Sequence, residues 1–191
     1  HKIFEMKILV FDNYDSFTYN IVALLHQLSV TTLDIYKNDK ITVAEAAQYD
    51  KIIISPGPAT PHESGNVLAI IDALAPTHPI LGICLGHQLL ALANGATTYK
   101  MHHGHRGLNH PVLNLVTGKS EISTQNHGFA VDKSSVLSNS NIQITHINLN
   151  DETLEGIRIK DKNAFSVQYH PEATPGPHDS RYLFDEFIAM I

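Results

Sequence analysis

The amino-acid sequence predicts an α/β protein with a mainly parallel sheet flanked by helices and a small antiparallel extension. Short, almost continuously apolar runs alternate with stretches of helical spacing through the first half of the 191-residue chain. Such runs are typical of parallel strands that are buried on both faces. The second half carries apolar runs joined by polar turns, which indicates antiparallel strands.

The first half is expected to contain four strand–helix units. Strands are predicted over residues 7–12, 32–36, 51–55 and 79–83, and helices over residues 18–28, 42–48, 65–74 and 85–94. Asp15 or Ser16 is expected to cap the first helix, because a short polar side chain can accept hydrogen bonds from the N–H groups of the first turn. Gly95 is expected to end the fourth helix.

The second half is expected to extend the sheet and close the fold. Strands are predicted over residues 121–125, 142–148, 153–159 and 164–168, and a helix over residues 179–191. The apolar face of that helix would be formed by Tyr182, Leu183, Phe184, Phe187 and Ile188. No repeat or linker interrupts the chain, so residues 1–191 are predicted to form a single domain.

The composition indicates which partners and which cellular compartment to expect. The formal net charge is −6, which argues against nucleic acid, because phosphate binding needs a basic face. No apolar run approaches the ~20 residues that span a bilayer, so no membrane association is expected. Residues 1–7 lack the apolar core of a secretory signal. The single cysteine excludes an internal disulfide, and a reducing, cytoplasmic compartment is expected.

Cys84 is the first candidate for catalysis. It lies in Gly82-Ile-Cys-Leu-Gly86, where the fourth strand meets its helix, and this pattern is the thiol counterpart of a nucleophile elbow. The turn would expose the sulfur at the carboxyl edge of the sheet, and the helix N-terminus would favour the thiolate. The N–H of Leu85 could donate to a developing oxyanion. The alternative is a buried cysteine that only packs between strand and helix.

His170 and Glu172 are the candidate partners of that cysteine. They follow the predicted strand 164–168 and are separated by Pro171. In an extended segment both side chains point the same way, so the carboxylate could orient the imidazole as a general base. Alone, the pair could also be an ordinary surface pair or two metal ligands. Together with the cysteine elbow, a catalytic triad is the favoured interpretation.

Thirteen histidines raise the question of a metal site. The densest group is His102, His103 and His105 with His110. It lacks a partnering cysteine and is predicted to lie in a glycine-containing loop. We therefore expect no metal there.

The two motifs Gly82-Ile-Cys-Leu-Gly-His-Gln88 and Tyr169-His-Pro-Glu172 resemble those of the class I (triad) glutamine amidotransferases, and the resemblance covers essentially the whole chain. It implies a flavodoxin-like fold and hydrolysis of L-glutamine through a glutamyl thioester on Cys84. His170 would act as acid and base, with no cofactor.

The resemblance also implies the residues that bind substrate. Gly57 and Leu85 would donate backbone N–H groups to the oxyanion, and Gln88 would hold the glutamine. Backbone groups of four consecutive residues, Asn126, His127, Gly128 and Phe129, would grip the amino and carboxylate ends of the substrate. Ala59 departs from the family pattern, in which glycine is frequent, and is expected to be tolerated.

The two halves resemble different subfamilies. Phe11-Asp-Asn-Tyr-Asp-Ser-Phe-Thr-Tyr-Asn20 resembles the small subunit of anthranilate or aminodeoxychorismate synthase, whereas Gly104-His-Arg-Gly-Leu-Asn-His-Pro111 resembles the carbamoyl-phosphate synthetase small subunit. The preferred hypothesis is a glutaminase subunit that delivers ammonia to a larger anthranilate or aminodeoxychorismate synthase partner. Residues 12–20 and 102–111 would be contact surfaces. The alternatives are a carbamoyl-phosphate synthetase-type subunit, a γ-glutamyl hydrolase and a non-catalytic binding module.

Overall fold

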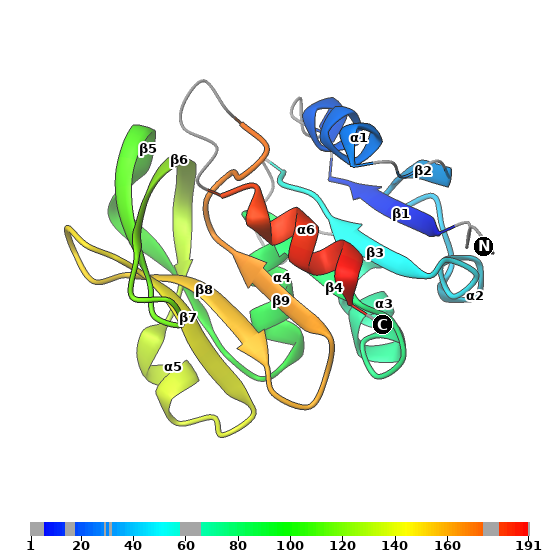
Figure 1. Cartoon of the computed structure of the whole chain (residues 1–191). Coiled ribbons are helices and arrows are strands. Elements are labelled where there is room, and N and C mark those ends of the chain that lie inside the picture. The colour runs from blue at the N-terminus through cyan, green and yellow to red at the C-terminus, as the bar shows by residue number, and fades with distance from the viewer. Residues whose placement is uncertain are drawn as a thin grey trace.

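One mixed sheet of nine strands organises the part of the chain that the structure describes. The structure is a computed structural model, and it describes residues 6–13, 18–28, 30, 32–57, 66–173 and 180–190. The strand order is β2-β1-β3-β4-β9-β8-β7-β5-β6, and helices lie on both faces (Figure 1). The predicted parallel sheet with an antiparallel extension is confirmed.

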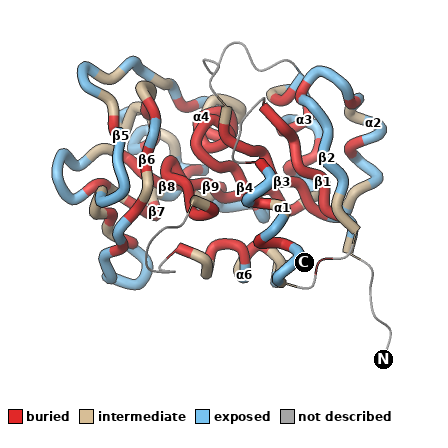
Figure 2. The backbone as a smooth tube through the Cα atoms, turned by 90° about the horizontal axis from the view of Figure 1, so that it is seen from above, coloured by how far each residue is buried: buried red, intermediate tan, exposed pale blue. Residues whose placement is uncertain are grey.

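Five strands form the parallel half of the sheet. They are β1 (Lys7–Asp12), β2 (Thr32–Lys37), β3 (Lys51–Ile54), β4 (Ile80–Ile83) and β9 (Ala164–Val167), and each is parallel to its neighbours within this half. Every residue of β3, β4 and β9 is buried. This complete burial explains why their sequences are apolar without alternation. Figure 2 shows these central strands enclosed and β2 exposed at the edge.

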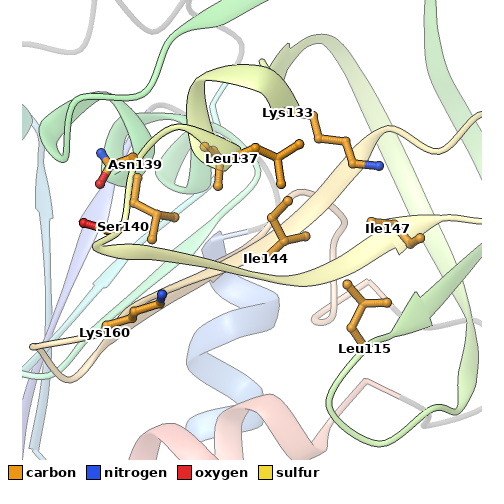
Figure 3. A pocket seen from close by; sticks show the side chains of 10 residues that line it. Leu115, Lys133, Leu137, Asn139, Ser140, Ile144, Ile147 and Lys160 are labelled. Carbon is orange, nitrogen blue, oxygen red and sulfur yellow. The ribbon is translucent and has the colours of Figure 1, made fainter.

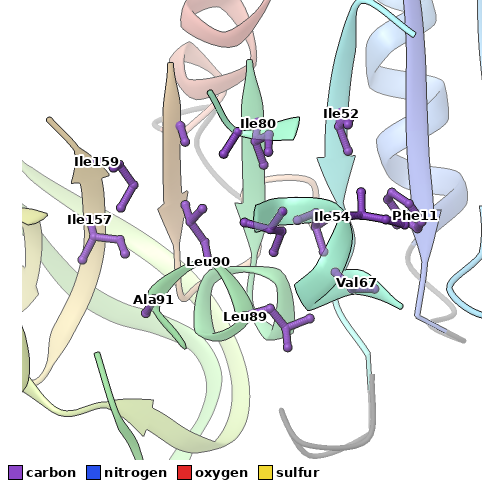
Figure 4. Close-up of a cluster of buried hydrophobic side chains, with 14 of the residues drawn as sticks. Phe11, Ile52, Ile54, Val67, Ile80, Leu89, Leu90, Ala91, Ile157 and Ile159 are labelled. Carbon is purple, nitrogen blue, oxygen red and sulfur yellow. The ribbon is translucent and has the colours of Figure 1, made fainter. Parts of the chain in front are cut away.

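Two apolar cores lie on opposite faces of the parallel strands. On one face, α1 (Thr18–Gln27) and α6 (Tyr182–Ala189) pack over side chains such as Ile8 and Val10. On the other, α3 (Val67–Leu74) and α4 (Leu85–Ala93) pack over Leu9 and Phe11 (Figure 4). Successive residues of β1 thus serve opposite cores, as the two-residue period of a strand requires.

The antiparallel half continues the sheet beyond β9. It consists of β8 (Leu154–Ile159), β7 (Ile142–Asn148), β5 (Thr98–Asn114) and β6 (Ser120–Val131), each antiparallel to its neighbour. The prediction of a loop over the histidine-rich residues was wrong, because they lie in β5. The predicted strand 121–125 was too short. The β5–β6 hairpin exposes polar side chains and contains two register shifts, so it lacks an apolar signal.

The remaining helices are short. The predicted helix 42–48 is reduced to α2 (Val43–Ala46), which begins with a capping box of Thr42 and Glu45. A helix that the sequence did not predict, α5 (Lys133–Leu137), is capped by Asp132. The proposed caps Asp15 and Ser16 lie outside the described residues. No helix in the described part of the chain is long and apolar enough to cross a membrane.

Candidate active site

Cys84 occupies a strained turn between β4 and α4. Its φ of 54° and ψ of −103° fall where a residue with a Cβ is rarely found, and such a conformation costs about 1–3 kcal/mol. The flanking glycines permit the turn. A Cβ on Gly86 would lie 2.2 Å from the carbonyl oxygen of Ile54, and one on Gly82 would lie 2.5 Å from that of Gly86. The nucleophile-elbow geometry predicted from the motif is therefore present.

His170 and Glu172 follow β9, the strand next to β4. The Nδ1 of His170 and the Oε1 of Glu172 are 2.7 Å apart, and both side chains are buried. Because a carboxylate only accepts, Nδ1 carries a proton and the second ring nitrogen remains for another partner. The N–H of His170 also donates to the carbonyl of Thr124 on β6 at 2.9 Å. The imidazole is thus fixed by its backbone and by its carboxylate.

The second partner of the His170 imidazole is Cys84. Burial by itself lowers the pKa of His170, but the hydrogen bonds and charges of Cys84 and Glu172 outweigh it and raise the pKa far above the usual value near 6.5. These contacts favour the charged, imidazolium form of His170. The structure therefore brings the three residues of the predicted triad together.

Two glutamine side chains form a hydrogen-bonded chain that reaches the sulfur. Gln168, two residues before His170, lies with its Nε2 3.7 Å from the sulfur of Cys84. Gln88 donates from Nε2 to the carbonyl of Phe129 at 3.0 Å and to Oε1 of Gln168 at 3.2 Å. Gln88 was predicted to hold substrate, and in the structure its side chain contacts Gln168, which lies next to the sulfur. Gln168 itself was missed, although its two-residue offset from His170, directly after β9, was a usable signal.

The predicted substrate-binding residues Asn126, His127, Gly128 and Phe129 lie on β6. The carbonyl of Asn126 is 3.9 Å from the sulfur of Cys84, so the start of this segment borders the nucleophile. The side chain of His127 bonds the carbonyl of Phe129 through Nδ1 at 2.7 Å. Burial lowers the pKa of His127 to about 4, and the bond to Phe129 opposes this only in part. His127 is therefore neutral near pH 7.

Gly57 and Leu85, the predicted oxyanion donors, are close neighbours. A Cβ on Gly57 would lie 2.9 Å from Cδ2 of Leu85 and 2.6 Å from the carbonyl oxygen of Asn13. Only a glycine fits such a close approach of backbone segments. Ala59, the departure from the family pattern, lies outside the described residues.

Glu121 anchors the segment that leads from β9 to His170, and this role was not predicted. This buried carboxylate accepts hydrogen bonds from Tyr169, Ser180 and Tyr182. Burial tends to raise the pKa of Glu121, but His146, Tyr182 and Tyr169 outweigh it and hold that pKa below the usual value. Since Tyr169 precedes His170, this network ties the end of β9 to β6 and α6. No local motif marks Glu121, because its three donors are at least 48 residues away.

A hollow of about 440 Å³ lies away from the triad. It is formed between α5 and β7, and Leu115, Leu137, Ile144 and Lys160 are among its lining residues (Figure 3). None of the candidate catalytic residues lines it. The hollow therefore carries no argument about the chemistry at Cys84.

The family of the chain follows from its sequence and its fold. The sequence of residues 9–190 matches the glutamine amidotransferase class-I family. The chain belongs to this family and is a glutamine amidotransferase domain.

Particular relatives narrow the comparison. The carbamoyl phosphate synthase small chain of Staphylococcus saprophyticus is 56% identical over 142 residues, covering 74% of this chain and 38% of the relative. That of Staphylococcus haemolyticus is 47% identical over 172 residues, covering 90% and 47%. The chain thus spans less than half the length of these curated relatives. They favour the carbamoyl-phosphate alternative, and the preferred anthranilate or aminodeoxychorismate synthase partner is not supported.

Solved structures share the fold. A protein of Thermoplasma acidophilum, described provisionally as part of a GMP synthase, superposes with a TM-score of 0.82 at 26% identity, covering 96% of this chain and 92% of that one. A glutamine amidotransferase of Thermotoga maritima gives a TM-score of 0.72 at 16% identity, covering 88% and 77%. The second likeness concerns the fold alone.

Proposed function

We propose that this chain is the glutaminase part of a carbamoyl-phosphate synthase small chain, that residues 1–191 act as one domain, and that the ammonia passes to a larger synthase subunit. The observation that carries the catalytic assignment is the placement of His170 between Cys84 and Glu172. The identity of the acceptor subunit rests on the relatives that carry the carbamoyl phosphate synthase name.

The chemistry would take place in two stages at Cys84. The thiolate attacks the side-chain amide carbon of L-glutamine, and His170 gives its proton to the departing ammonia, which leaves a glutamyl thioester. His170 then takes a proton from water, which attacks the thioester and releases glutamate. Glu172 holds the imidazole in one tautomer and stabilises its charged form.

Backbone groups would stabilise the tetrahedral intermediates. The N–H groups of Gly57 and Leu85 would donate to the oxyanion, and removing one such donor commonly costs about 10²–10³ in kcat. Asn126, His127, Gly128 and Phe129 would offer backbone groups to the amino and carboxylate ends, while Gln88 and Gln168 would border the amide. No step of this sequence calls for a metal or another cofactor.

The first test identifies the nucleophile and the substrate. The purified chain is incubated with L-glutamine or γ-glutamyl peptides, and glutamate release is measured; a glutamine-like chloroketone is then used to label the enzyme for mass spectrometry. We expect glutamine to be preferred and the label to be found on Cys84. A preference for peptides would support a γ-glutamyl hydrolase, and an unlabelled Cys84 would support a non-catalytic module.

The second test identifies the acceptor. Cys84→Ser is combined with a carbamoyl-phosphate synthase large subunit, and carbamoyl phosphate formation is measured with glutamine and with free ammonia. We expect loss of the glutamine-dependent reaction only. Loss of both reactions, or absence of any complex with the wild-type chain, would contradict the proposed division of labour.

A further inference from the structure

Three buried side chains converge between the β5–β6 hairpin and β8. They are His105 on β5, His127 on β6 and Glu155 on β8, and their nearest nitrogen and oxygen atoms all lie within 4.8 Å of one another. Glu155 has no exposed side-chain surface. Two imidazoles and one carboxylate are a donor set that proteins use for zinc.

The two rings are turned so that one nitrogen of each faces the other. The Nε2 of His105 lies 2.5 Å from Oδ2 of Asp151, and the Nδ1 of His127 lies 2.7 Å from the carbonyl oxygen of Phe129. Both oxygens only accept, so these nitrogens carry the protons. That leaves Nδ1 of His105 and Nε2 of His127 facing each other at 3.3 Å. Metal-binding histidines usually donate their other N–H to a carboxylate or carbonyl in this way.

Two side-chain oxygen atoms lie next to these ring nitrogens. The Oε1 of Glu155 is 3.3 Å from Nδ1 of His105, and the amide oxygen of Gln125 is 2.9 Å from Nε2 of His127. Among the described residues, no hydrogen-bond partner reaches the other carboxylate oxygen of Glu155, although it is buried. The Nδ2 of Asn148 donates to Oε1 of Glu155 at 3.4 Å, so Oε2 is the buried carboxylate oxygen that a cation could satisfy.

Two of the three spacings also agree with a tetrahedral ion, and the atoms of the third pair, His127 and Glu155, lie within 4.8 Å of each other. Ligand atoms about 2.05 Å from zinc lie about 3.3 Å apart when the geometry is tetrahedral. The distances from Nδ1 of His105 to Nε2 of His127 and to Oε1 of Glu155 are both 3.3 Å.

We propose that His105, His127 and Glu155 bind one divalent transition metal ion, with Zn²⁺ the best match, and that Gln125 or a water molecule supplies the fourth ligand. The ion would join β5, β6 and β8. It would have a structural role, since the side chain of His127 bonds within its own strand to Phe129, and Cys84 is not among the donors. The proposal does not depend on the function proposed above.

Metal binding tests the site directly. The chain, prepared without an oligohistidine tag and stripped with a chelator, is titrated with Zn²⁺ and with Co²⁺; bound metal is counted by mass spectrometry, and tetrahedral coordination is followed by Co²⁺ absorption. We expect one equivalent of tightly bound ion and a higher melting temperature with Zn²⁺. A wild-type chain that binds no ion above the level of surface histidines would overturn the proposal.

Two variants and a control locate the ion. Glu155→Gln removes a charged ligand and is expected to weaken Zn²⁺ binding at least 100-fold. Asp151→Asn keeps all three ligands but loses the carboxylate that orients His105, so a loss of about 10–100-fold is expected. His103→Ala removes an exposed histidine and should leave affinity unchanged. Equal affinity of wild type and Asp151→Asn, or a loss with His103→Ala, would refute the site even if Glu155→Gln failed to fold.

Discussion

Gly86 is the residue at which the elbow leaves no room for a side chain. In Gly86→Ala the new Cβ would lie 2.2 Å from the carbonyl oxygen of Ile54 and 2.9 Å from its Cβ. Carbon–oxygen contacts in proteins are normally about 3.3 Å or longer. The start of α4 must therefore move about 1 Å away from β3, and Cys84 must move with it.

The magnitude follows from this displacement. Overpacking of a close-packed interior costs about 1–3 kcal/mol, and for a domain of this size each kcal/mol lowers the melting temperature by about 2–4 °C. We therefore expect a loss of about 2–12 °C. A misplacement of about 1 Å at a reacting group can lower kcat on the order of 100-fold. The measurements are thermal unfolding and steady-state glutamate release.

Gly118→Ala is the matched control. Unlike Gly86, Gly118 has a positive φ, of 73°, but no atom lies within 4 Å of its Cβ position, so this variant meets a backbone strain of about 1–2 kcal/mol and no steric clash. This variant should keep its kcat. If Gly86→Ala were no less stable than Gly118→Ala and hydrolysed glutamine at the wild-type rate, the argument that close packing fixes the nucleophile would be refuted.

Three further predictions test the groups that support the site. Glu172→Gln replaces the carboxylate at Nδ1 of His170 and should lower kcat about 10²–10⁴-fold, measured by glutamate release. Glu121→Gln removes a charged acceptor of three hydroxyl groups and should cost about 1–3 kcal/mol in urea unfolding. Burial lowers the pKa of His87 from 6.5 to about 3. Below pH 6.5, His87 therefore binds a proton in the unfolded chain but stays neutral in the folded protein. The free energy of unfolding falls between pH 6.5 and 3, by about 2 kcal/mol at pH 5. His87→Asn should lose this part of the pH dependence.

Each of these predictions has a control or a contrary outcome. For Glu121 the control is Glu186→Gln, a half-exposed partner of Arg158, which should cost no more than about 1 kcal/mol; equal losses would contradict the anchoring role. A fall in kcat of less than tenfold for Glu172→Gln would remove the carboxylate from the triad. An unchanged pH slope in His87→Asn would show that His87 does not set it.

The parallel half of the fold could be predicted because each of its buried strands is a short, nearly continuous apolar run in the sequence. The runs at residues 7–12, 51–54 and 80–83 are apolar because both faces of those strands are covered. The β5–β6 hairpin could not be predicted in the same way. Its pairing joins residues such as His105 and His127, and polar side chains in an exposed hairpin give no period that distinguishes strand from loop.

In the candidate site too, residues in local sequence patterns could be predicted, whereas residues that depend on contacts made by the fold could not. The elbow at Cys84 and the pair His170 and Glu172 are short patterns whose chemistry can be inferred from neighbours in the chain. Glu121 and Glu155 gain their importance only from residues on other strands, so no local pattern identifies them. The histidine cluster was predicted to have no metal on the basis of its neighbours in sequence, whereas the partners that the fold supplies to His105 are His127 and Glu155.

The adjacency of β4 and β9 governs how the nucleophile and the base can move. Cys84 directly follows β4 and His170 follows β9, and the N–H of Cys84 donates to the carbonyl of Val167 at 3.0 Å. This bond continues the hydrogen bonds between β4 and β9, so the backbone at Cys84 cannot separate from the end of β9 unless these hydrogen bonds break. The backbone at Cys84 is therefore held to the end of β9, whereas Gly57, the proposed oxyanion donor, follows the end of β3 and has no such bond to Cys84 among the described hydrogen bonds.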